Sequence, residues 1–416
     1  MSSSSPNLTV PIHQPEWNSK PAWKLPGWAE PIMVASILFA AMYFTRRRNY
    51  SILPRRAPYT SFLDAPDSAR SSDDLLPYEA VSDSDEDAAF TASTKCPPKR
   101  RRWCGFTVYT PNTSRFRHHL HSRLLQKFPF LVEMLYWIIN YAFYRMTSIS
   151  AQALFAKTGI WNVAQRHGLW ILQFEEYGPL SWLFPLKERD VQRWFMAGHQ
   201  DALTFLNRTY ALIHIPGTVG FIAWYYYAAP SHRTFAIARR TMTLTNFLAF
   251  ATFVCYPTMP PRLLPAEYGF LDSVRHDDAQ SVWMSGRFVN ALAAMPSMHF
   301  GYAFCIGCTL LWHSTLLRAR WGGLERGERE KSLLGKIGYV ALGFGYPALI
   351  LTTIVATANH YFLDAAVATL YVFFAFAANR VFFVFIPLED WFLWCIRAEK
   401  PVPSTGERMR GGEREG

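Results

Sequence analysis

Seven long apolar runs constrain the fold of this chain more than any other feature of its sequence. Several approach the roughly 20 apolar residues with which a helix crosses a bilayer. The chain is 50% hydrophobic and only 18% charged, whereas an average soluble domain has about 25% charged residues. We therefore expect an all-α polytopic membrane protein. The runs cover about 28–44, 128–149, 210–229, 241–256, 297–317, 337–358 and 362–386.

The basic residues predict the orientation of these runs. The net charge is +11, and in a membrane protein such an excess marks cytoplasmic loops rather than a nucleic-acid surface. Three consecutive arginines, 46–48, follow the first run, which places the N-terminus in the lumen. Residues 230–240, 318–336 and the C-terminal tail then fall in the cytoplasm, and all three are basic. The opposite, luminal side receives 150–209, 257–296 and 359–361.

Composition also suggests how the chain is divided. Residues 49–127 lack apolar periodicity and pass from an acidic stretch to a basic one, which is typical of a solvated linker. Aromatic and charged residues broken by Gly159, Gly168, Gly178 and Pro185 indicate interfacial amphipathic helices within 150–205. The predicted regions are a disordered luminal N-terminus (1–27), a first transmembrane helix (28–44), a disordered cytoplasmic linker (45–127), a catalytic membrane domain (128–390) and a cytoplasmic tail (391–416).

The fifth run begins with a motif suited to binding an anion. Pro296, Ser297, Met298 and His299 stand at its start. Proline is tolerated in the first turn of a helix, where free backbone N–H groups and the helix dipole attract negative charge. The Ser297 hydroxyl adds a donor, and His299 adds a proton that titrates near neutrality.

Two further motifs are expected at the same membrane face. Arg262 follows the fourth run, while His360 and Asp364 lie at the junction of the sixth and seventh. The latter two are four residues apart and share one face of a helix. An arginine for phosphate oxygens, one imidazole to attack phosphorus and another to protonate the leaving oxygen predict phosphoryl transfer without metal or cofactor. Each residue alone also fits a structural role, such as head-group contact or helix capping.

These motifs resemble the signatures of the type 2 phosphatidic acid phosphatase superfamily. Tyr-Pro-x-x-Pro-Pro-Arg262, Ala-Met-Pro-Ser-Met-His299 and Asn-His360-Tyr-Phe-Leu-Asp364 are most similar to its inositol phosphorylceramide synthase branch, over about residues 130–390. The resemblance implies a six-helix core preceded by one extra helix. It also implies that His360 is a nucleophile forming a phosphohistidine, that Asp364 orients it, and that His299 protonates the leaving group. Arg262 would bind phosphate, with Ser297 and Met298 in the cradle.

The chain departs from the superfamily pattern at two cationic positions. Cys255 stands where the pattern has lysine, and Ile354 where it has arginine. Fewer cations suit a phosphodiester better than a dianionic monoester. Arg275, His276 and Arg287, before the fifth run, are candidates to compensate. The candidates for substrate binding are His214, Arg287, Asn359 and Tyr361.

The sequence thus predicts a membrane enzyme that moves a phosphoinositol-like head group to a ceramide-like lipid. Its partners would be membrane lipids and the bilayer, with no nucleic acid, and its active site would face the lumen of the Golgi or endoplasmic reticulum. No protein partner is indicated. One alternative is a lipid phosphate or pyrophosphate phosphatase. Another is a non-catalytic lipid-binding or scaffold protein, against which the retention of all four catalytic positions argues.

Overall fold

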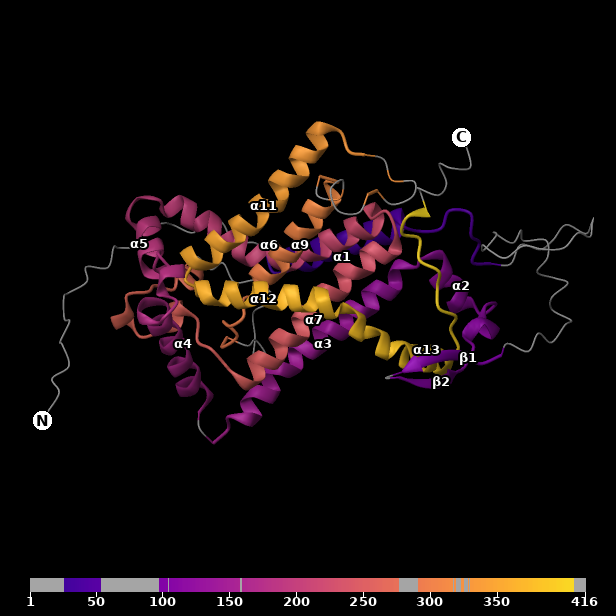
Figure 1. Ribbon diagram of the computed structural model, residues 1–416, viewed down its shortest axis with the longest axis horizontal. Coiled ribbons are helices and arrows are strands. Elements are labelled where there is room, and N and C mark those ends of the chain that lie inside the picture. Colours follow the sequence, from indigo (N-terminus) through magenta and orange to yellow (C-terminus); the bar gives the residue numbers. More distant parts are fainter. Residues whose placement is uncertain are drawn as a thin grey trace, which may run out of the picture. The chain divides into compact units, whose positions relative to one another are not determined.

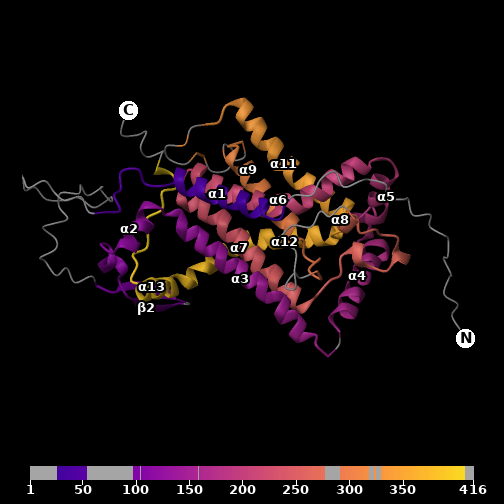
Figure 2. The ribbon, with the colours of Figure 1, turned by 180° about the vertical axis from the view of Figure 1, so that it is seen from behind.

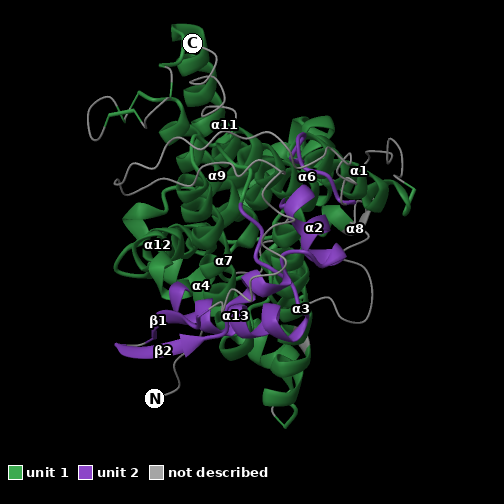
Figure 3. Ribbon diagram, turned by 90° about the vertical axis from the view of Figure 1, so that its right-hand side faces the viewer, with its two compact units in different colours: residues 1–45, 130–382, 403–416 green, residues 46–129, 383–402 purple. Residues whose placement is uncertain are grey.

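The computed structural model describes residues 26–53, 97–103, 105–157, 159–276, 291–316, 318, 323–324, 328 and 330–407. These residues form two compact units (Figure 3). The first takes in Met1–Thr45, Phe130–Phe382 and Pro403–Gly416, and the second Arg46–Pro129 and Phe383–Val402. Most of the described residues are helical, so the predicted all-α class is confirmed.

The first unit is a bundle in which each predicted apolar run overlaps one helix. In Figures 1 and 2, α3 and α7 lie side by side, as do α9 and α11. Apolar side chains between the helices form the core, with Tyr225, Phe235 and Ile354 almost fully buried. The long helices are α1 (Ala29–Phe44), α3 (Phe130–Leu154), α6 (Gln200–Ala228), α7 (His232–Cys255), α9 (Met298–His313), α11 (Leu333–Ala356) and α12 (Phe362–Ala378).

Two glycines bring α9 and α11 into close contact. A Cβ at Gly307 would lie 2.5 Å from the carbonyl oxygen of Gly343, and one at Gly343 would lie 2.7 Å from Leu311. Real side chains do not approach so closely, so only glycine allows these two backbones to meet. Small residues at helix contacts are the usual means of such packing within membranes.

Short helices cover the end of the bundle where α11 ends and α12 begins (Figure 1). They are α4 (Ile160–Tyr177), η2 (Ser181–Leu183), α5 (Glu188–Gly198) and α8 (Ser273–His276). Helix α4 begins after Gly159, which has a positive φ of 73°, and ends at Gly178. Its Ile171 is buried, whereas Trp161 and Trp170 are exposed. The helices expected within 150–205 are therefore present.

Two helical stretches are long and apolar enough to cross a membrane, judged by length and composition. They are Leu333–Ala356 and Phe362–Cys395, and α1 is a shorter apolar helix. The predicted six-helix transmembrane core is not established by this criterion.

The second unit has ordered strands and helices in residues 97–127, part of the stretch 45–127 for which the sequence predicts a disordered linker. Strands β1 (Lys99–Trp103) and β2 (Phe106–Thr110) pair in antiparallel fashion, and η1 (Thr113–Phe116) and α2 (Leu120–Lys127) follow them. Helix α13 (Ile386–Cys395), which spans the predicted boundary between the catalytic domain and the tail, packs on this sheet. Residues 54–96 of the expected linker and residues 1–25 of the expected N-terminus lie outside the described residues.

A buried carboxylate explains why this basic segment folds. Asp390 of α13 accepts hydrogen bonds from Arg101 Nε at 2.9 Å and from the Thr110 hydroxyl at 2.8 Å. The ion pair neutralises part of the basic run, and β2 supplies the β-branched and aromatic residues that favour strands. Arg101 and Asp390 are 289 residues apart, so the linker's composition gave no indication of this partner.

Candidate active site

The turn between α11 and α12 fixes His360. The backbone N–H groups of Asn359 and His360 both donate to the carbonyl oxygen of Ile354, at 3.0 and 3.1 Å. Ala358 adopts a positive φ of 52°, a left-handed conformation that glycine usually supplies at the end of a helix and that costs other residues about 1–2 kcal/mol. The surrounding contacts thus hold a strained turn that presents His360.

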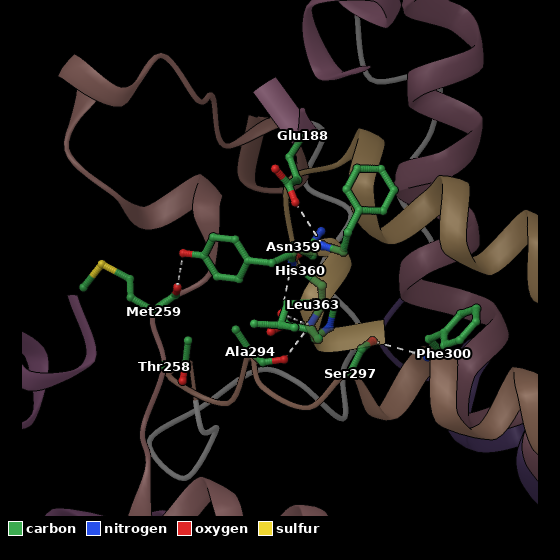
Figure 4. Close-up of polar contacts among 12 residues, drawn as sticks. Glu188, Thr258, Met259, Ala294, Ser297, Phe300, Asn359, His360 and Leu363 are labelled. Carbon is green, nitrogen blue, oxygen red and sulfur yellow. Dashed lines mark hydrogen bonds and ion pairs between the residues drawn. The ribbon is translucent and has the colours of Figure 1, made fainter. Parts of the chain in front are cut away.

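The His360 imidazole is buried and held through one nitrogen. Its Nδ1 lies 2.7 Å from the carbonyl oxygen of Ala294 and 3.3 Å from Asp364 Oδ2 (Figure 4). Because both partners are acceptors, Nδ1 carries the proton and Nε2 keeps its lone pair. Among the described residues, Nε2 has no hydrogen-bond partner. This is the tautomer that a nucleophilic or basic imidazole requires.

Asp364 connects two of the predicted motifs. Its Oδ2 also accepts the backbone N–H of Tyr361 at 2.9 Å, and its backbone carbonyl oxygen accepts the N–H of Ser297 at 3.2 Å. The carboxylate therefore caps α12 while it faces His360. The Ala294 carbonyl oxygen is the nearer acceptor of the Nδ1 proton, and sequence patterns cannot indicate a backbone acceptor.

His299 stands in the first turn of α9, next to His360. The Ser297 hydroxyl caps this helix by accepting the N–H of Phe300 at 3.3 Å. The His299 ring stacks on Tyr210 of α6 with their centroids 4.2 Å apart, and its centroid is 5.7 Å from that of His360. The two predicted imidazoles are thus brought together. Tyr210, which is part of this ring cluster, was missed because nothing in its sequence surroundings marks it.

Arg262 lies in the 3₁₀ turn Pro261–Leu263 (η3), and it is tied to the His360 turn. Its backbone N–H donates to the carbonyl oxygen of Ala358 at 2.9 Å, and its Nε donates to Asn359 Oδ1 at 2.8 Å. Its Nη1 pairs with Asp272 Oδ2 at 2.8 Å. Asp272, also missed from the sequence, offsets part of the charge that Arg262 offers to an anion.

The other predicted residues occupy varied surroundings. Asn359 Nδ2 donates to the Thr357 hydroxyl at 2.7 Å, and Met298 is half-buried among apolar side chains. The hydroxyl of Tyr361 donates to the carbonyl oxygen of Met259 at 2.8 Å, and burial raises the pKa of this phenol well above its ordinary value.

The structure leaves several candidates without a described side chain. His214 lies within α6 and Arg275 and His276 lie within α8, but only their backbones are described, and Arg287 lies outside the described residues. Ile354, at one of the two unusual positions, is buried in the apolar core between helices. Cys255, at the other, is exposed. Within the described ranges, no three His, Cys, Asp or Glu side chains gather as metal ligands.

Comparison with known proteins finds a similarity at the level of a superfamily. The family model of the PAP2 superfamily matches residues 170–324. The match includes Arg262 and the Ser297–His299 motif, and it ends before His360 and Asp364. No curated protein and no solved structure matches the chain. The similarity therefore supports chemistry of the lipid phosphatase and phosphotransferase type, and it does not extend to a particular branch.

Proposed function

We propose that this protein is an integral membrane lipid phosphotransferase with His360 as its nucleophile. The observation that carries the proposal is the geometry of the imidazole pair. His360 is held at Nδ1 by two oxygen acceptors, and the ring of His299 lies 5.7 Å away between centroids. One imidazole is thus oriented for attack while a second is near enough to transfer a proton.

The proposed reaction has two steps. In the first, His360 Nε2 attacks the phosphorus of a lipid phosphodiester, the bond to the leaving oxygen breaks, and His299 gives that oxygen a proton. In the second, the acceptor's hydroxyl gives its proton to His299 and attacks the phosphohistidine, which frees His360. Arg262 binds the non-bridging oxygens in both steps.

The charge of the site favours a phosphodiester donor over a phosphate monoester. A diester carries one negative charge, whereas a monoester carries up to two near neutral pH. Arg262 already shares Asp272, and Ile354 places an apolar group where the superfamily pattern has arginine. We therefore infer transfer of a phosphoinositol-like head group to a ceramide-like lipid, without a metal, at the luminal face of a Golgi or endoplasmic reticulum membrane.

The test is an assay of purified protein in liposomes that contain phosphatidylinositol and a fluorescent ceramide, with and without EDTA. We expect a fluorescent phosphoinositol ceramide, equal rates in both conditions, and no product from His360→Ala. Release of inorganic phosphate from phosphatidic acid, with no ceramide product, would identify a phosphatase instead. Binding of either lipid without turnover of any donor would indicate a non-catalytic lipid-binding protein.

A further inference from the structure

Three carboxyl groups from three helices cap the first turn of α12. The N–H of Phe362 donates to Glu188 Oε1 at 2.9 Å (Figure 4). The N–H of Tyr361 donates to Asp364, and that of Leu363 to Glu175 Oε1 at 2.6 Å. Glu175 lies in the last turn of α4, and Glu188 is the first residue of α5. They are only 5% and 3% exposed. Two short helices are therefore fastened to the turn that follows His360.

Glu175 is neutral at ordinary pH. Burial and the neighbouring Glu188 raise the pKa of Glu175 to about 10, although the Leu363 N–H acts in the opposite direction. The charge of Asp364, from α12, also raises it. The neutral carboxyl can still accept the Leu363 N–H through its carbonyl oxygen.

The tight packing around this turn transmits the position of α4 and α5 to the catalytic residues. A Cβ at Gly168 of α4 would lie 2.7 Å from the Tyr361 hydroxyl and 2.9 Å from the Met259 carbonyl oxygen. Tyr361 follows His360 directly and is the first of the three capped residues. A displacement of α4 or α5 would therefore move the backbone that carries His360, and rates fall steeply when a reacting group is misplaced by about 1 Å.

We propose that Glu175 and Glu188 are positioning residues for His360, which clamp the first turn of α12 through the N–H groups of Leu363 and Phe362. The neutral form of Glu175 also limits negative charge beside a site that must admit a phosphate anion. This role rests on the proposed function of His360. The protonation of Glu175 can be tested without any assay of activity.

The variant Glu175→Gln tests whether residue 175 must position the Leu363 backbone or must carry a negative charge. Its amide oxygen can accept the Leu363 N–H, and its uncharged amide matches the neutral carboxyl in size and charge. We expect kcat and KM within about twofold of the natural protein. Glu175→Leu removes the hydrogen bond to the Leu363 N–H, and we expect kcat to fall by about tenfold or more with little change in KM, because positioning acts on the chemical step. The neighbouring Glu176, which pairs with exposed Lys187, offers the matched control Glu176→Leu, for which we expect no change.

Thermal unfolding of purified protein across pH tests the protonation of Glu175 directly. A carboxyl whose pKa is raised by folding stabilises the fold fully below its ordinary value of 4.5, and this stability is lost as the pH rises toward about 10. Glu175→Gln has no such proton. Its melting temperature relative to the natural protein should therefore increase steadily from pH 5 to pH 9, and that of Glu176→Gln should not.

The two measurements separate the possible failures. A melting-temperature difference that does not depend on pH would overturn the protonated state of Glu175. Wild-type kcat in folded Glu175→Leu would overturn the positioning role, as would an equal loss of kcat in the Gln and Leu variants. If the natural protein shows no transfer activity but the pH dependence of Glu175→Gln is as expected, the proposed function fails and the clamp remains as a device of the fold. Should Glu175→Leu not fold, loss of kcat in Glu175→Gln at unchanged melting temperature would still contradict the proposal.

Discussion

Helix α9 carries a buried histidine at each end, and the two ends differ in what surrounds the ring. At the N-terminal end, His299 stacks on Tyr210 and lies beside His360, whose Nδ1 faces the oxygens of Ala294 and Asp364. At the other end, the His313 ring lies edge-on to Tyr339, with centroids 5.1 Å apart, and to Trp224.

Charged groups sharpen this contrast. Arg318 forms a buried ion pair with Glu328 at 2.7 Å and lies over the ring of Trp312. Lys331 lies over the ring of Tyr339. Thus a carboxylate, a carbonyl oxygen and a second imidazole lie at the first end, whereas aromatic rings and cations lie at the second. Burial alone therefore does not distinguish the two histidines. What sets the proposed catalytic end apart is a pair of imidazoles with acceptors that fix one proton.

The largest expected effect is the loss of His360. We expect His360→Ala to abolish transfer and also to abolish labelling of the protein by a donor with labelled phosphate, because no other described imidazole has the same acceptors at Nδ1. The label on the natural protein should be stable to base and labile to acid. Measurement of turnover and of bound label in the same samples checks this. Label that persists in His360→Ala would place the nucleophile elsewhere.

His299 is the next test, because its proposed role depends on the leaving group. His299→Phe keeps a ring to stack on Tyr210 but removes the proton, and general acids contribute about 10²–10⁴-fold. We expect a loss within that range with a lipid alkoxide as leaving group, and a clearly smaller loss with an activated donor such as a nitrophenyl phosphodiester. Rates with both donors, measured for His299→Phe and His360→Ala together, decide the matter. Equal losses with both donors would favour direct attack by the acceptor over the two-step mechanism.

The variant Asp364→Asn tests which acceptor orients His360. The amide can still accept the Tyr361 N–H, and the Ala294 carbonyl oxygen still faces Nδ1 at 2.7 Å. What is lost is the negative charge beside the imidazole. We expect kcat to fall on the order of a hundredfold with little change in melting temperature. A loss of less than about threefold would mean that the Ala294 carbonyl oxygen alone sets the tautomer.

Spacing in the sequence was enough to bring the main groups of the site together. His299 lies in the first turn of α9 and His360 precedes α12, so the start of each apolar run predicted where each histidine lies. The missed contributors have no such local signal. Glu188 lies 174 residues from Phe362, whose N–H it accepts, and Glu175 lies 188 residues from Leu363, whose N–H it accepts. The Ala294 acceptor is a backbone carbonyl that every residue type possesses.

The error in the second unit has a similar cause. A basic stretch is typical of solvated chain when nothing neutralises it, and the composition of residues 97–127 could not reveal Asp390. The strand signal in Phe106–Thr110 was present but short, and a two-stranded hairpin is only marginally stable by itself. Its stability depends on α13, which is distant in the sequence.

The smallest effect is expected at the other end of α9, and it completes the comparison. His313→Phe makes the same change as His299→Phe on the same helix. The phenyl ring can keep the edge-on contacts with Trp224 and Tyr339, and the imidazole nitrogens of His313 face none of the acceptors found around His360 among the described residues. We expect kcat with either donor to stay within about twofold, since His313 contacts none of the groups that are proposed to react. A loss as large as that of His299→Phe, in protein with an unchanged melting temperature, would show that the two ends of α9 are coupled and that the acceptors around His360 do not by themselves define the proposed catalytic end.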